Sequence, residues 1–410
     1  MIFIKLNKYN MLGEIFFYGL IIFVIILILI YCYIKLNHHF WSLQPVYHFY
    51  DYHYSFLSNR IINEELPEIN RYCEFNKIEY YDVNKLSALK RKDFCKLIRG
   101  HFLHNRDNKY VPSQSNIFPY FKGHNSLCHI SLYYEDEILN DTKDHSFITN
   151  KRLIGAMTNR PLHITFKNAG SFYCNYIDYL CVDKEYRKKG IAPQLIQTHE
   201  YNMRHSNKQI KVSLFKREGE ITGIIPLCIY KTYIYDMIRW LKPDDFYPGE
   251  ANIIEGNRKT MHYFLDFMKD HMKKFSVVIV PDVYNIAELL RTENLYMYML
   301  LENDEVTSIY IFQKSCTQIV KGSEGLICLG SINKASSKDM FIHGFKIALW
   351  KIVEKYKKYR HIVIEDMSDN NMLINNLNMR SRILNTVPCA YFLYNYIKQP
   401  VKSNEVFFIA

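Results

Sequence analysis

The chain has 410 residues, and its composition of 49% hydrophobic and 23% charged residues is typical of a globular protein rather than a disordered one. A chain of this length can bury a sizeable core, so we expect two domains or two fused halves. The formal net charge of +11 favours an anionic partner, such as a phosphorylated cofactor or a membrane surface. Because the sequence has no long basic run and no zinc-finger spacing, it predicts no nucleic-acid partner.

The N-terminal segment from Ile15 to Ile34 carries no charged residue. A helix of about 20 residues spans a hydrocarbon core of about 30 Å. The apolar stretch is longer than that of a signal peptide, and no small-residue cleavage site ends it. We therefore expect residues 1–14 to be a tail and residues 15–34 to be a retained, single-pass membrane helix.

Strand-like and helix-like segments alternate through the first half of the remaining chain. Leu153–Met157 and His163–Phe166 are expected to be two short strands separated at Asn159-Arg160-Pro161, and Asn175–Val182 a stronger one. A helix is predicted from Ala192-Pro193 towards Arg204.

The second half shows the same mixture. Leu295–Leu301 and Val306–Phe312 flank Glu302-Asn303-Asp304-Glu305, which predicts a β-hairpin. Ser336 or Ser337 caps an amphipathic helix that runs to about residue 356, and a strand is expected from His361 to Glu365. Prolines and a glycine cluster between residues 240 and 249, where we place a lobe boundary.

Cysteine and histidine usage points away from disulfides and metals. Ten cysteines are scattered without a C-x-x-C pair, which indicates reduced thiols in a cytosolic compartment. His124, Cys128 and His129 are close in sequence, but no second ligand pair follows at a zinc-like spacing, so we predict no metal site.

One stretch carries a pattern suited to chemistry. After the strand that ends at Val182 come a basic turn, Gly190 and a helix with Pro193 in its first turn. Proline suits that position, glycine lets a ligand approach the backbone, and free N–H groups at a helix start bind anions. The residues therefore predict a pyrophosphate cradle. The spacing of Arg187, Gly190 and Ala192 resembles the coenzyme A loop of the acetyltransferase superfamily.

Three ordered matches extend this resemblance to one family. The residues Tyr179-Leu180-Cys181-Val182, with the basic turn and Ala192-Pro193 after them, resemble the first signature of the N-myristoyltransferases. Phe40-Trp41-Ser42-Leu43-Gln44-Pro45-Val46 is similar to that family's F-W-x-T-Q-P-V. Tyr391-Phe392-Leu393-Tyr394-Asn395-Tyr396 is similar to its Y-Y-L-Y-N-W. The resemblance runs in order from about residue 39 to residue 410.

The resemblance implies an α/β (α+β) fold of two fused acetyltransferase-like (GNAT-like) lobes around a twisted, mostly antiparallel sheet, preceded here by the membrane helix. Residues 35–240 would bind acyl-CoA and residues 241–410 the peptide. The implied activity is transfer of a myristoyl group from myristoyl-CoA, a co-substrate, to the N-terminal glycine of a protein or peptide. We expect the enzyme to be a monomer. Its reduced cysteines and a coenzyme A site would both place the catalytic part in the cytosol. The implied acyl-CoA contacts are His39, Phe40, Trp41, Tyr179, Leu180, Cys181, Val182, Arg187, Lys188, Lys189, Gly190, Ile191 and Ala192.

The family's mechanism implies five catalytic positions. Backbone N–H groups of Tyr179 and Leu180 would form the oxyanion hole, and the C-terminal carboxylate of Ala410 would be the base. Asp178 stands where the family has an asparagine that holds the substrate's amino group. Thr222 corresponds to a threonine with a similar role.

Departures from the family pattern leave alternatives open. The family's Gly-Asp-Gly loop before the last signature is replaced by Asn385-Thr386-Val387. A histidine of the family is also missing, and Tyr235 is the residue nearest to its position. One alternative is a catalytically impaired, membrane-anchored protein that binds acyl-CoA or a myristoylated peptide. Another is an N-acetyltransferase that uses acetyl-CoA, although such small enzymes lack the Phe40-Trp41 match and the C-terminal signature.

Overall fold

In the computed structural model the chain divides into two compact units, Met1–Val46 and Tyr47–Ala410, and each is considered by itself. The structure describes residues 2–37, 39–103, 109–140, 147–219, 223–247, 249, 251–320, 323–379 and 381–409.

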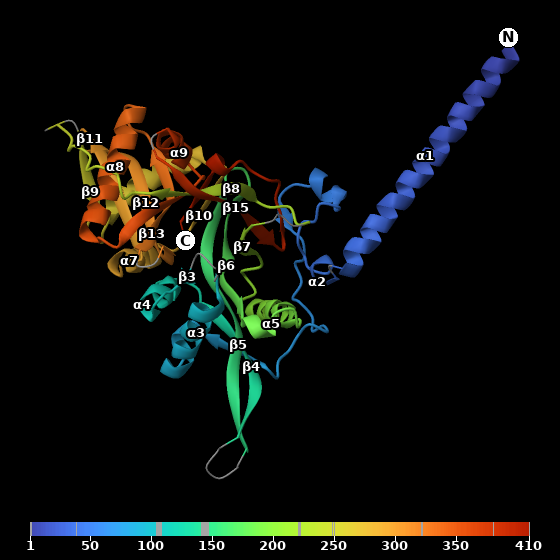
Figure 1. Cartoon of the computed structure of the whole chain (residues 1–410), viewed down its shortest axis with the longest axis horizontal. Helices are drawn as coiled ribbons and strands as arrows, with labels where there is room; N and C mark the ends of the chain where they lie inside the picture. The colour runs from blue at the N-terminus through green and yellow to red at the C-terminus, as the bar shows by residue number, and fades with distance from the viewer. Residues whose placement is uncertain are drawn as a thin grey trace. The chain divides into compact units, whose positions relative to one another are not determined.

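The first unit is helical. It contains α1 (Ile2–Asn37) and the short α2 (His39–Ser42). Within α1, the 20 residues Glu14–Tyr33 have a mean hydropathy of 3.1 and are long and apolar enough to cross a membrane. This segment is the predicted Ile15–Ile34 shifted by one residue, and Figure 1 shows α1 as one uninterrupted helix.

The second unit is built on a 15-stranded sheet with the main order β17-β10-β5-β6-β7-β15-β8-β14-β13-β12-β11-β9. Strand pairs are antiparallel except for β6·β7, β13·β14 and β10·β17. The strands are β2 (Ile78–Asp82), β3 (Lys109–Tyr110), β4 (His129–Asn140), β5 (Phe147–Phe166), β6 (Gly170–Val182), β7 (Ser213–Glu218), β8 (Cys228–Asp236), β9 (Asn252–Glu255), β10 (Val277–Val280), β11 (Leu295–Glu302), β12 (Glu305–Val320), β13 (Ser323–Asn333), β14 (Tyr359–Glu365), β15 (Ile383–Tyr394) and β17 (Val406–Phe408), with β1 (Arg60–Ile61) and β16 (Tyr396–Ile397) in a separate pair.

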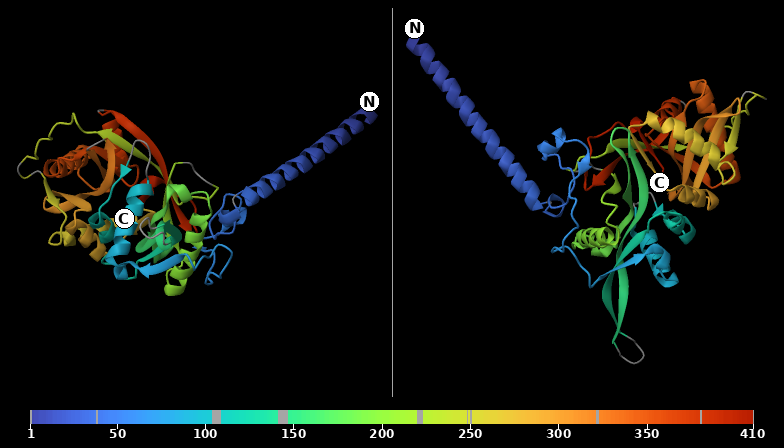
Figure 2. Two further views of the ribbon diagram at one scale, coloured as in Figure 1. Left: turned by 60° about the horizontal axis from the view of Figure 1, so that its bottom comes forward. Right: turned by 180° about the vertical axis from the view of Figure 1, so that it is seen from behind.

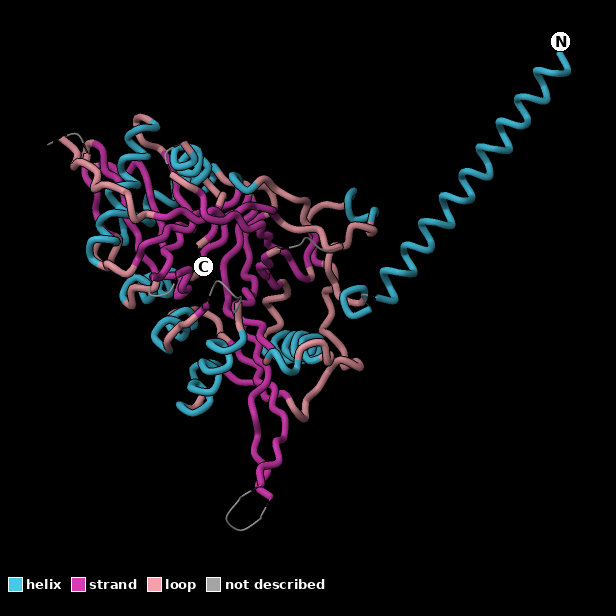
Figure 3. The backbone as a smooth tube through the Cα atoms, in the orientation of Figure 1, coloured by secondary structure: helices cyan, strands magenta, loops and turns pink. Residues whose placement is uncertain are grey.

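Helices lie outside the strands in this unit, as the tube of Figure 3 shows. The α-helices are α3 (Ala88–His101), α4 (Gln114–Ile117), α5 (Ile191–Ser206), α6 (Met261–His271), α7 (Val283–Arg291), α8 (Lys338–Lys355) and α9 (Asn370–Asn378). The 3₁₀ turns are η1 (Tyr52–Phe56), η2 (Val83–Lys85), η3 (Phe118–Phe121), η4 (Lys184–Tyr186), η5 (Met272–Lys274) and η6 (Ser403–Glu405).

The same arrangement occurs once in each half of the sheet. In the first half, β4, β5 and β6 form an antiparallel meander, and α5 then leads to β7, which is parallel to β6. In the second half, β11, β12 and β13 form a meander, and α8 leads to β14, parallel to β13. The two halves meet through the antiparallel strands β7, β15, β8 and β14. The predicted α/β fold with two similar halves around a mostly antiparallel sheet is therefore confirmed.

Strand β5 differs from the prediction. The sequence predicted two short strands with a break around Pro161, but β5 is one strand of 20 residues, and with β4 it forms the long arm seen in Figure 2. On one edge, β4 pairs with β5 as far as Asn159 and β10 pairs with it from His163. Proline has no N–H to donate, but Pro161 lies between these two partners, so no ladder bond is lost on that edge.

The predicted hairpin and helix cap are confirmed. Asn303 and Asp304 adopt left-handed φ angles of 52° and 64° in the turn between β11 and β12, as a two-residue hairpin turn requires. Of the two candidate caps, Ser337 is the one whose side chain accepts a hydrogen bond, from the N–H of Met340, at the start of α8.

Candidate active site

The parallel strands β6 and β7 separate part-way along their length. They pair over Asn175–Ile177 and Ser213–Phe215 and no further, although β6 continues to Val182 and β7 to Glu218. Beyond the last pair, Asp178 and Lys216 begin the two arms of a fork. A fork between strands exposes backbone groups that have no ladder partner, which suits it to hold a ligand.

A β-bulge lies at the start of this fork. The register between β5 and β6 shifts between Met157 and Asn159. Met157 and Asn159 are two residues apart on β5, but their partners Leu180 and Ile177 are three residues apart on β6. One extra residue is therefore inserted in β6, which is a β-bulge.

At the bulge, the N–H of Tyr179 donates to a side chain of the neighbouring strand rather than to a backbone carbonyl. This N–H donates to the hydroxyl oxygen of Thr158 at 3.2 Å. The Tyr179 hydroxyl lies 2.9 Å from the hydroxyl of Tyr110, which comes from β3. Tyr179, which the sequence predicts as an oxyanion donor, therefore has a buried backbone N–H, and its phenol pairs with that of Tyr110.

Asp178 is half of a buried ion pair. Its Oδ1 and Oδ2 accept from Nε of Arg160 at 3.1 and 2.9 Å. The Arg160 guanidinium packs over two aromatic rings, 5.2 Å from the centroid of Tyr120 and 5.3 Å from that of Tyr176. Burial raises the pKa of Asp178, and the nearby Arg160 charge acts in the opposite direction without cancelling that effect.

A second ion pair faces the first from across the fork. Nζ of Lys216, on β7, lies 2.7 Å from Oε1 of Glu365, on β14, and the Tyr230 hydroxyl donates to the same oxygen at 3.3 Å. Glu365 is buried, and its Oε2 has no hydrogen-bond partner among the described residues. Burial opposes the charge on Lys216, but Glu365 and other anionic groups keep the pKa of that amine above its ordinary value.

The end of the chain approaches this charged region. Strand β17 pairs with β10, and the N–H of the buried Ile409 donates to the carbonyl oxygen of Ile279 at 2.9 Å. The ring of Phe408 lies 5.7 Å from that of Tyr176, which is itself in contact with Arg160. Ala410, predicted as the base, and Thr222 lie outside the described residues.

The predicted anion cradle has a suitable backbone. Gly190 caps α5 with φ of 80°, a left-handed angle, and open space surrounds the position where a Cβ would stand. Lys188 also has a left-handed φ, of 64°. Lys188 and Lys189 are exposed beside the first turn of α5, whose N–H groups have no partner within the helix.

Arg187 has a different environment from the two lysines. Its Nε donates to the carbonyl oxygen of Val182 at 3.2 Å, and its Nη2 to that of His101 at 2.6 Å. The side chain therefore ties the basic turn to the end of α3. Cys181 and Val182 are buried at the end of β6, and Ile191 is buried in α5.

The remaining predicted contacts belong to the first unit. Phe40 and Trp41 lie in α2, and their rings are 5.2 Å apart at an angle of 71°. His39 begins the same helix, and its carbonyl oxygen accepts from the Ser42 hydroxyl.

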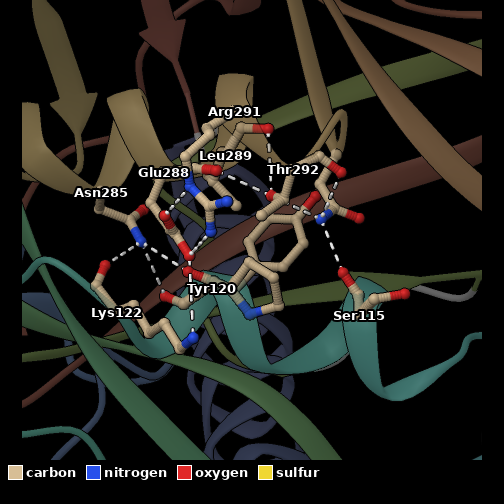
Figure 4. Close-up of polar contacts among 10 residues, drawn as sticks. Ser115, Tyr120, Lys122, Asn285, Glu288, Leu289, Arg291 and Thr292 are labelled. Carbon is tan, nitrogen blue, oxygen red and sulfur yellow. Dashed lines mark hydrogen bonds and ion pairs between the residues drawn. The ribbon is translucent and has the colours of Figure 1, made fainter.

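Hydrogen bonds from Asn285, in the second half of the chain, hold the backbone at Tyr120 in place. The side-chain amide of Asn285, in α7, lies 3.1, 3.2 and 2.7 Å from the carbonyl oxygens of Pro119, Tyr120 and Lys122 (Figure 4). These contacts fix the backbone of η3, and the ring of Tyr120 then packs on Arg160.

Among the described residues, no group of three or more His, Cys, Asp or Glu side chains could hold a metal ion. His124 is engaged elsewhere, since its Nε2 lies 2.9 Å from the carbonyl oxygen of Tyr120 and its Nδ1 3.4 Å from Asp282. The Asn385-Thr386-Val387 segment, expected as a loop, is part of β15 and pairs with β8.

The sequence analysis does not identify the charged residues Arg160, Lys216 and Glu365 of this site. Their signal is a charged residue in or beside a strand, because charged side chains are almost never fully buried without a partner. For Arg160, the neighbouring Pro161 indicated a break between strands instead.

Comparisons with known proteins find a related family model and similar folds. Residues 68–228 match the family model described as Myristoyl-CoA:protein N-myristoyltransferase, N-terminal domain. A crystal structure of Saccharomyces cerevisiae N-myristoyltransferase with bound myristoyl-CoA is similar to 90% of this chain and 94% of its own, with a TM-score of 0.67 and 12% identity. Another, with bound myristoyl-CoA and inhibitors, is similar over 90% and 91%, with a TM-score of 0.68 and 12% identity.

A sequence search of curated proteins finds no match. The family model and the fold nevertheless confirm the resemblance that the three sequence motifs predicted. Residues 68–228 match the model of the N-terminal domain of the N-myristoyltransferases, and the chain as a whole has the fold of the yeast N-myristoyltransferase structures.

Proposed function

We propose that the chain transfers a myristoyl group from myristoyl-CoA to the N-terminal glycine amine of a protein or peptide. The observation that carries the proposal is the fork between β6 and β7, where β6 holds a bulged backbone donor, contacts the final strand through Tyr176 and Phe408, and leads into the basic turn before α5. The family assignment and the yeast structures with bound myristoyl-CoA support the same reaction.

The acyl-CoA would occupy the first half of the fork. Lys188, Lys189 and the N–H groups at the start of α5 suit the phosphates, and Tyr179 to Val182 suit the thioester and the start of the acyl chain. Arg187 would act mainly by fixing the turn. His39, Phe40 and Trp41 complete the proposed acyl-CoA contacts, and the proposal includes no metal.

The proposed chemistry needs a stabilised oxyanion and a deprotonated amine. Backbone N–H groups of Tyr179 and Leu180 are the proposed oxyanion hole, and each such donor is worth about 2.7–4 kcal/mol in comparable enzymes. When acyl-CoA binds, the N–H of Tyr179 would give up its hydrogen bond to Thr158 and donate to the thioester oxygen instead. The Ala410 carboxylate is the proposed base, with Asp178 and Thr222 near the amine.

The proposed division of labour follows the two halves of the fold. Residues 35–240 would bind acyl-CoA and residues 241–410 the peptide, in a monomer. The apolar segment of α1 would anchor the enzyme in a membrane with its catalytic part in the cytosol, where coenzyme A thioesters and reduced cysteines are found.

A second candidate is a protein that binds acyl-CoA or a myristoylated peptide without turnover. It is favoured by the contacts already made at the site, where the N–H of Tyr179 donates to Thr158 and Asp178 is paired with Arg160. An acetyl-CoA-dependent N-acetyltransferase is the other alternative.

One assay separates these functions. The whole chain is incubated with radiolabelled myristoyl-CoA or acetyl-CoA and a panel of Gly-initiated peptides, and the acylated peptide is counted. Myristoyl transfer supports the proposal, acetyl transfer alone contradicts it, and acyl-CoA binding without transfer to any peptide supports the second candidate.

A further inference from the structure

Two grooves open on either side of the segment that follows β3, and Val111 lines both of them. The first groove, of about 800 Å³, lies between α3 and residues 111–114. The second groove, of about 270 Å³, is lined by the same segment and by residues of β12 and β13. Val111 follows Tyr110, whose hydroxyl lies 2.9 Å from that of Tyr179. Both grooves therefore begin one residue away from the partner of the proposed oxyanion donor.

The first groove has a cationic rim beside apolar surface. Lys92, Lys96 and Arg99 are exposed, and their spacing places them on one side of α3. None of these three side chains forms a salt bridge within the described part of the chain. Leu89, which also lines the groove, is 67% exposed. Asp93 is the acidic residue of this groove, so the positive charge of the rim is only partly compensated.

The second groove extends this positive charge to the other half of the sheet. Lys314 lines it without a salt bridge to any described residue, and Lys109, two residues before Val111, is exposed. Glu324 is the acidic residue of this groove, and it pairs with Lys358 at 2.6 Å. Together the two grooves carry more positive charge than their own acidic residues neutralise.

The stability of α3 does not account for this rim. Lys90, in the same helix, pairs with Glu79, so it has a structural partner. Lys92 and Lys96 are four residues apart, and Arg99 is three residues further on, which are the spacings at which like charges on a helix repel each other. An unpaired row of cations that weakens its own helix is better explained by an anionic partner that binds to it.

The proposed reaction has two substrates, and one of them already has a cationic site. The phosphates of acyl-CoA are assigned to Lys188, Lys189 and the start of α5. The acceptor peptide must bring its glycine to the same reaction centre, and an extended chain advances about 3.3 Å per residue. The residues that follow the glycine therefore need a path away from the centre, and the two grooves beside Val111 offer one that selects by charge.

We propose that the two grooves bind the residues that follow the N-terminal glycine of the acceptor, and that preferred acceptors carry Asp or Glu at these positions. The inference rests on the proposed function and deepens it, because it names the class of peptide. It also gives the first half of the fold a share in peptide binding through α3.

The test measures kcat/KM of the whole wild-type chain for Gly-initiated peptides that differ only in four consecutive residues after the third, which are Glu, Gln or Lys. The Glu peptide should have the highest value, through a lower KM. Salt should reduce its advantage, because the Debye length falls from about 10 Å at 0.1 M to about 3 Å at 1 M. Equal values for the three peptides, or a preference for the Lys peptide, would overturn the inference.

The triple variant Lys92→Glu/Lys96→Glu/Arg99→Glu reverses the rim of α3. Glutamate is a good helix former and the three positions are exposed, so the fold should be retained. Its kcat/KM for the Glu peptide should fall about 10- to 100-fold, because each exposed ion pair is worth about 1.5- to 5-fold and the reversal replaces attraction by repulsion. The Lys peptide should become the better acceptor, a reversal that a damaged fold would not produce.

The triple variant Lys208→Glu/Lys269→Glu/Lys273→Glu is the matched control. It changes the net charge by the same amount at exposed lysines that line neither groove. It should keep the wild-type order of the three peptides. If it reverses that order as the α3 variant does, the net charge of the protein selects the peptide and the grooves do not.

The KM for myristoyl-CoA, measured with the same proteins, separates the two substrates. A rise of that KM in the α3 variant with an unchanged order of peptides would assign the rim to the co-substrate and overturn the inference. If the wild type acylates all three peptides equally well, the proposed function stands and only this inference fails. If it acylates no Gly-initiated peptide, the proposed function fails and the inference with it.

Discussion

Tyr110 and Tyr179 satisfy each other's hydroxyl groups at 2.9 Å beside the proposed oxyanion donor. Tyr179→Phe should destabilise the fold by about 1–3 kcal/mol because it leaves the Tyr110 hydroxyl without this partner. The double change to Phe should restore much of that stability, since removing both partners of a buried hydrogen bond is often nearly neutral. Chemical denaturation of the four proteins gives the coupling energy.

The same variants separate side chain from backbone at position 179. All three should retain turnover, because the proposed donor is the N–H group. If the stability changes of the two single variants add up to that of the double variant, the pairing of the two hydroxyl groups is contradicted. If the stable double variant loses turnover, the proposed role of the Tyr179 N–H is contradicted.

Glu200 makes stability depend on pH. It is 7% exposed in α5, and burial raises its pKa to about 7, against a weaker opposing effect of Arg204. A raised pKa means that the folded chain binds an extra proton, so this contribution is full below about pH 4.5 and is lost as the pH rises through 7. Glu200→Gln should therefore stabilise the fold at pH 8 by about 3 kcal/mol and leave it unchanged at pH 4.5.

Denaturation midpoints at the two pH values check this prediction. Glu185→Gln is the control, because the Glu185 side chain is 73% exposed and should give no difference at either pH. An equal gain for Glu200→Gln at pH 4.5 and 8 would show that the carboxylate is not the cause.

At the residue scale, the sequence indicated the positions of residues on their elements better than it indicated side-chain partners. Gly190 and Tyr179 stand in local patterns, a helix start and a strand end, that the chain order alone reveals. The partner of Asp178 could not be predicted, because Arg160 reaches it only through the register of β5 and β6. A bulge shifts that register by one residue and leaves no signal in the order of residue types.

The cap of α8 offers a test at the scale of one element. The sequence left Ser336 and Ser337 as alternatives, and in the structure the Ser337 side chain accepts from the N–H of Met340. Ser337→Ala should cost about 1 kcal/mol of stability, because that N–H has no partner within the helix.

Ser336→Ala is a matched control one residue away, also exposed, and should change stability by less than about 0.5 kcal/mol. Thermal denaturation of both variants measures the difference. Equal effects would show that capping does not set the stability of this helix.

Elements with a strong local pattern were predicted closely, and those that depend on neighbours were not. The turn at Asn303-Asp304 follows from residues that tolerate left-handed angles. The predicted break at Pro161 was wrong, because whether a proline interrupts a strand depends on which strands lie beside it. Likewise, the replacement of the family's Gly-Asp-Gly loop by a β15 segment depends on pairing with β8.

The two halves of the molecule share one sheet rather than standing apart. Strand β15, from near the end of the chain, lies between β7 and β8 of the first half. The site in the fork therefore combines residues from both halves, as the approach of Phe408 to Tyr176 illustrates. Chain length indicated two domains or two fused halves, but the pairing that joins the halves connects residues more than a hundred positions apart and has no local signal.

The N-terminal helix is the largest feature without a counterpart in the proposed chemistry. Residues 1–46 form a compact unit of their own, and Glu14–Tyr33 could cross a membrane. Deletion of residues 2–34 should move the protein from the membrane pellet to the soluble fraction while kcat/KM for a soluble Gly-initiated peptide stays at the wild-type value, because His39, Phe40 and Trp41 remain. Replacing the deleted segment with an unrelated apolar helix should restore the membrane fraction, since length and hydropathy decide insertion. N-terminal sequencing of the purified whole chain completes the test: a mature protein that begins after residue 34 would identify a cleaved signal instead of an anchor.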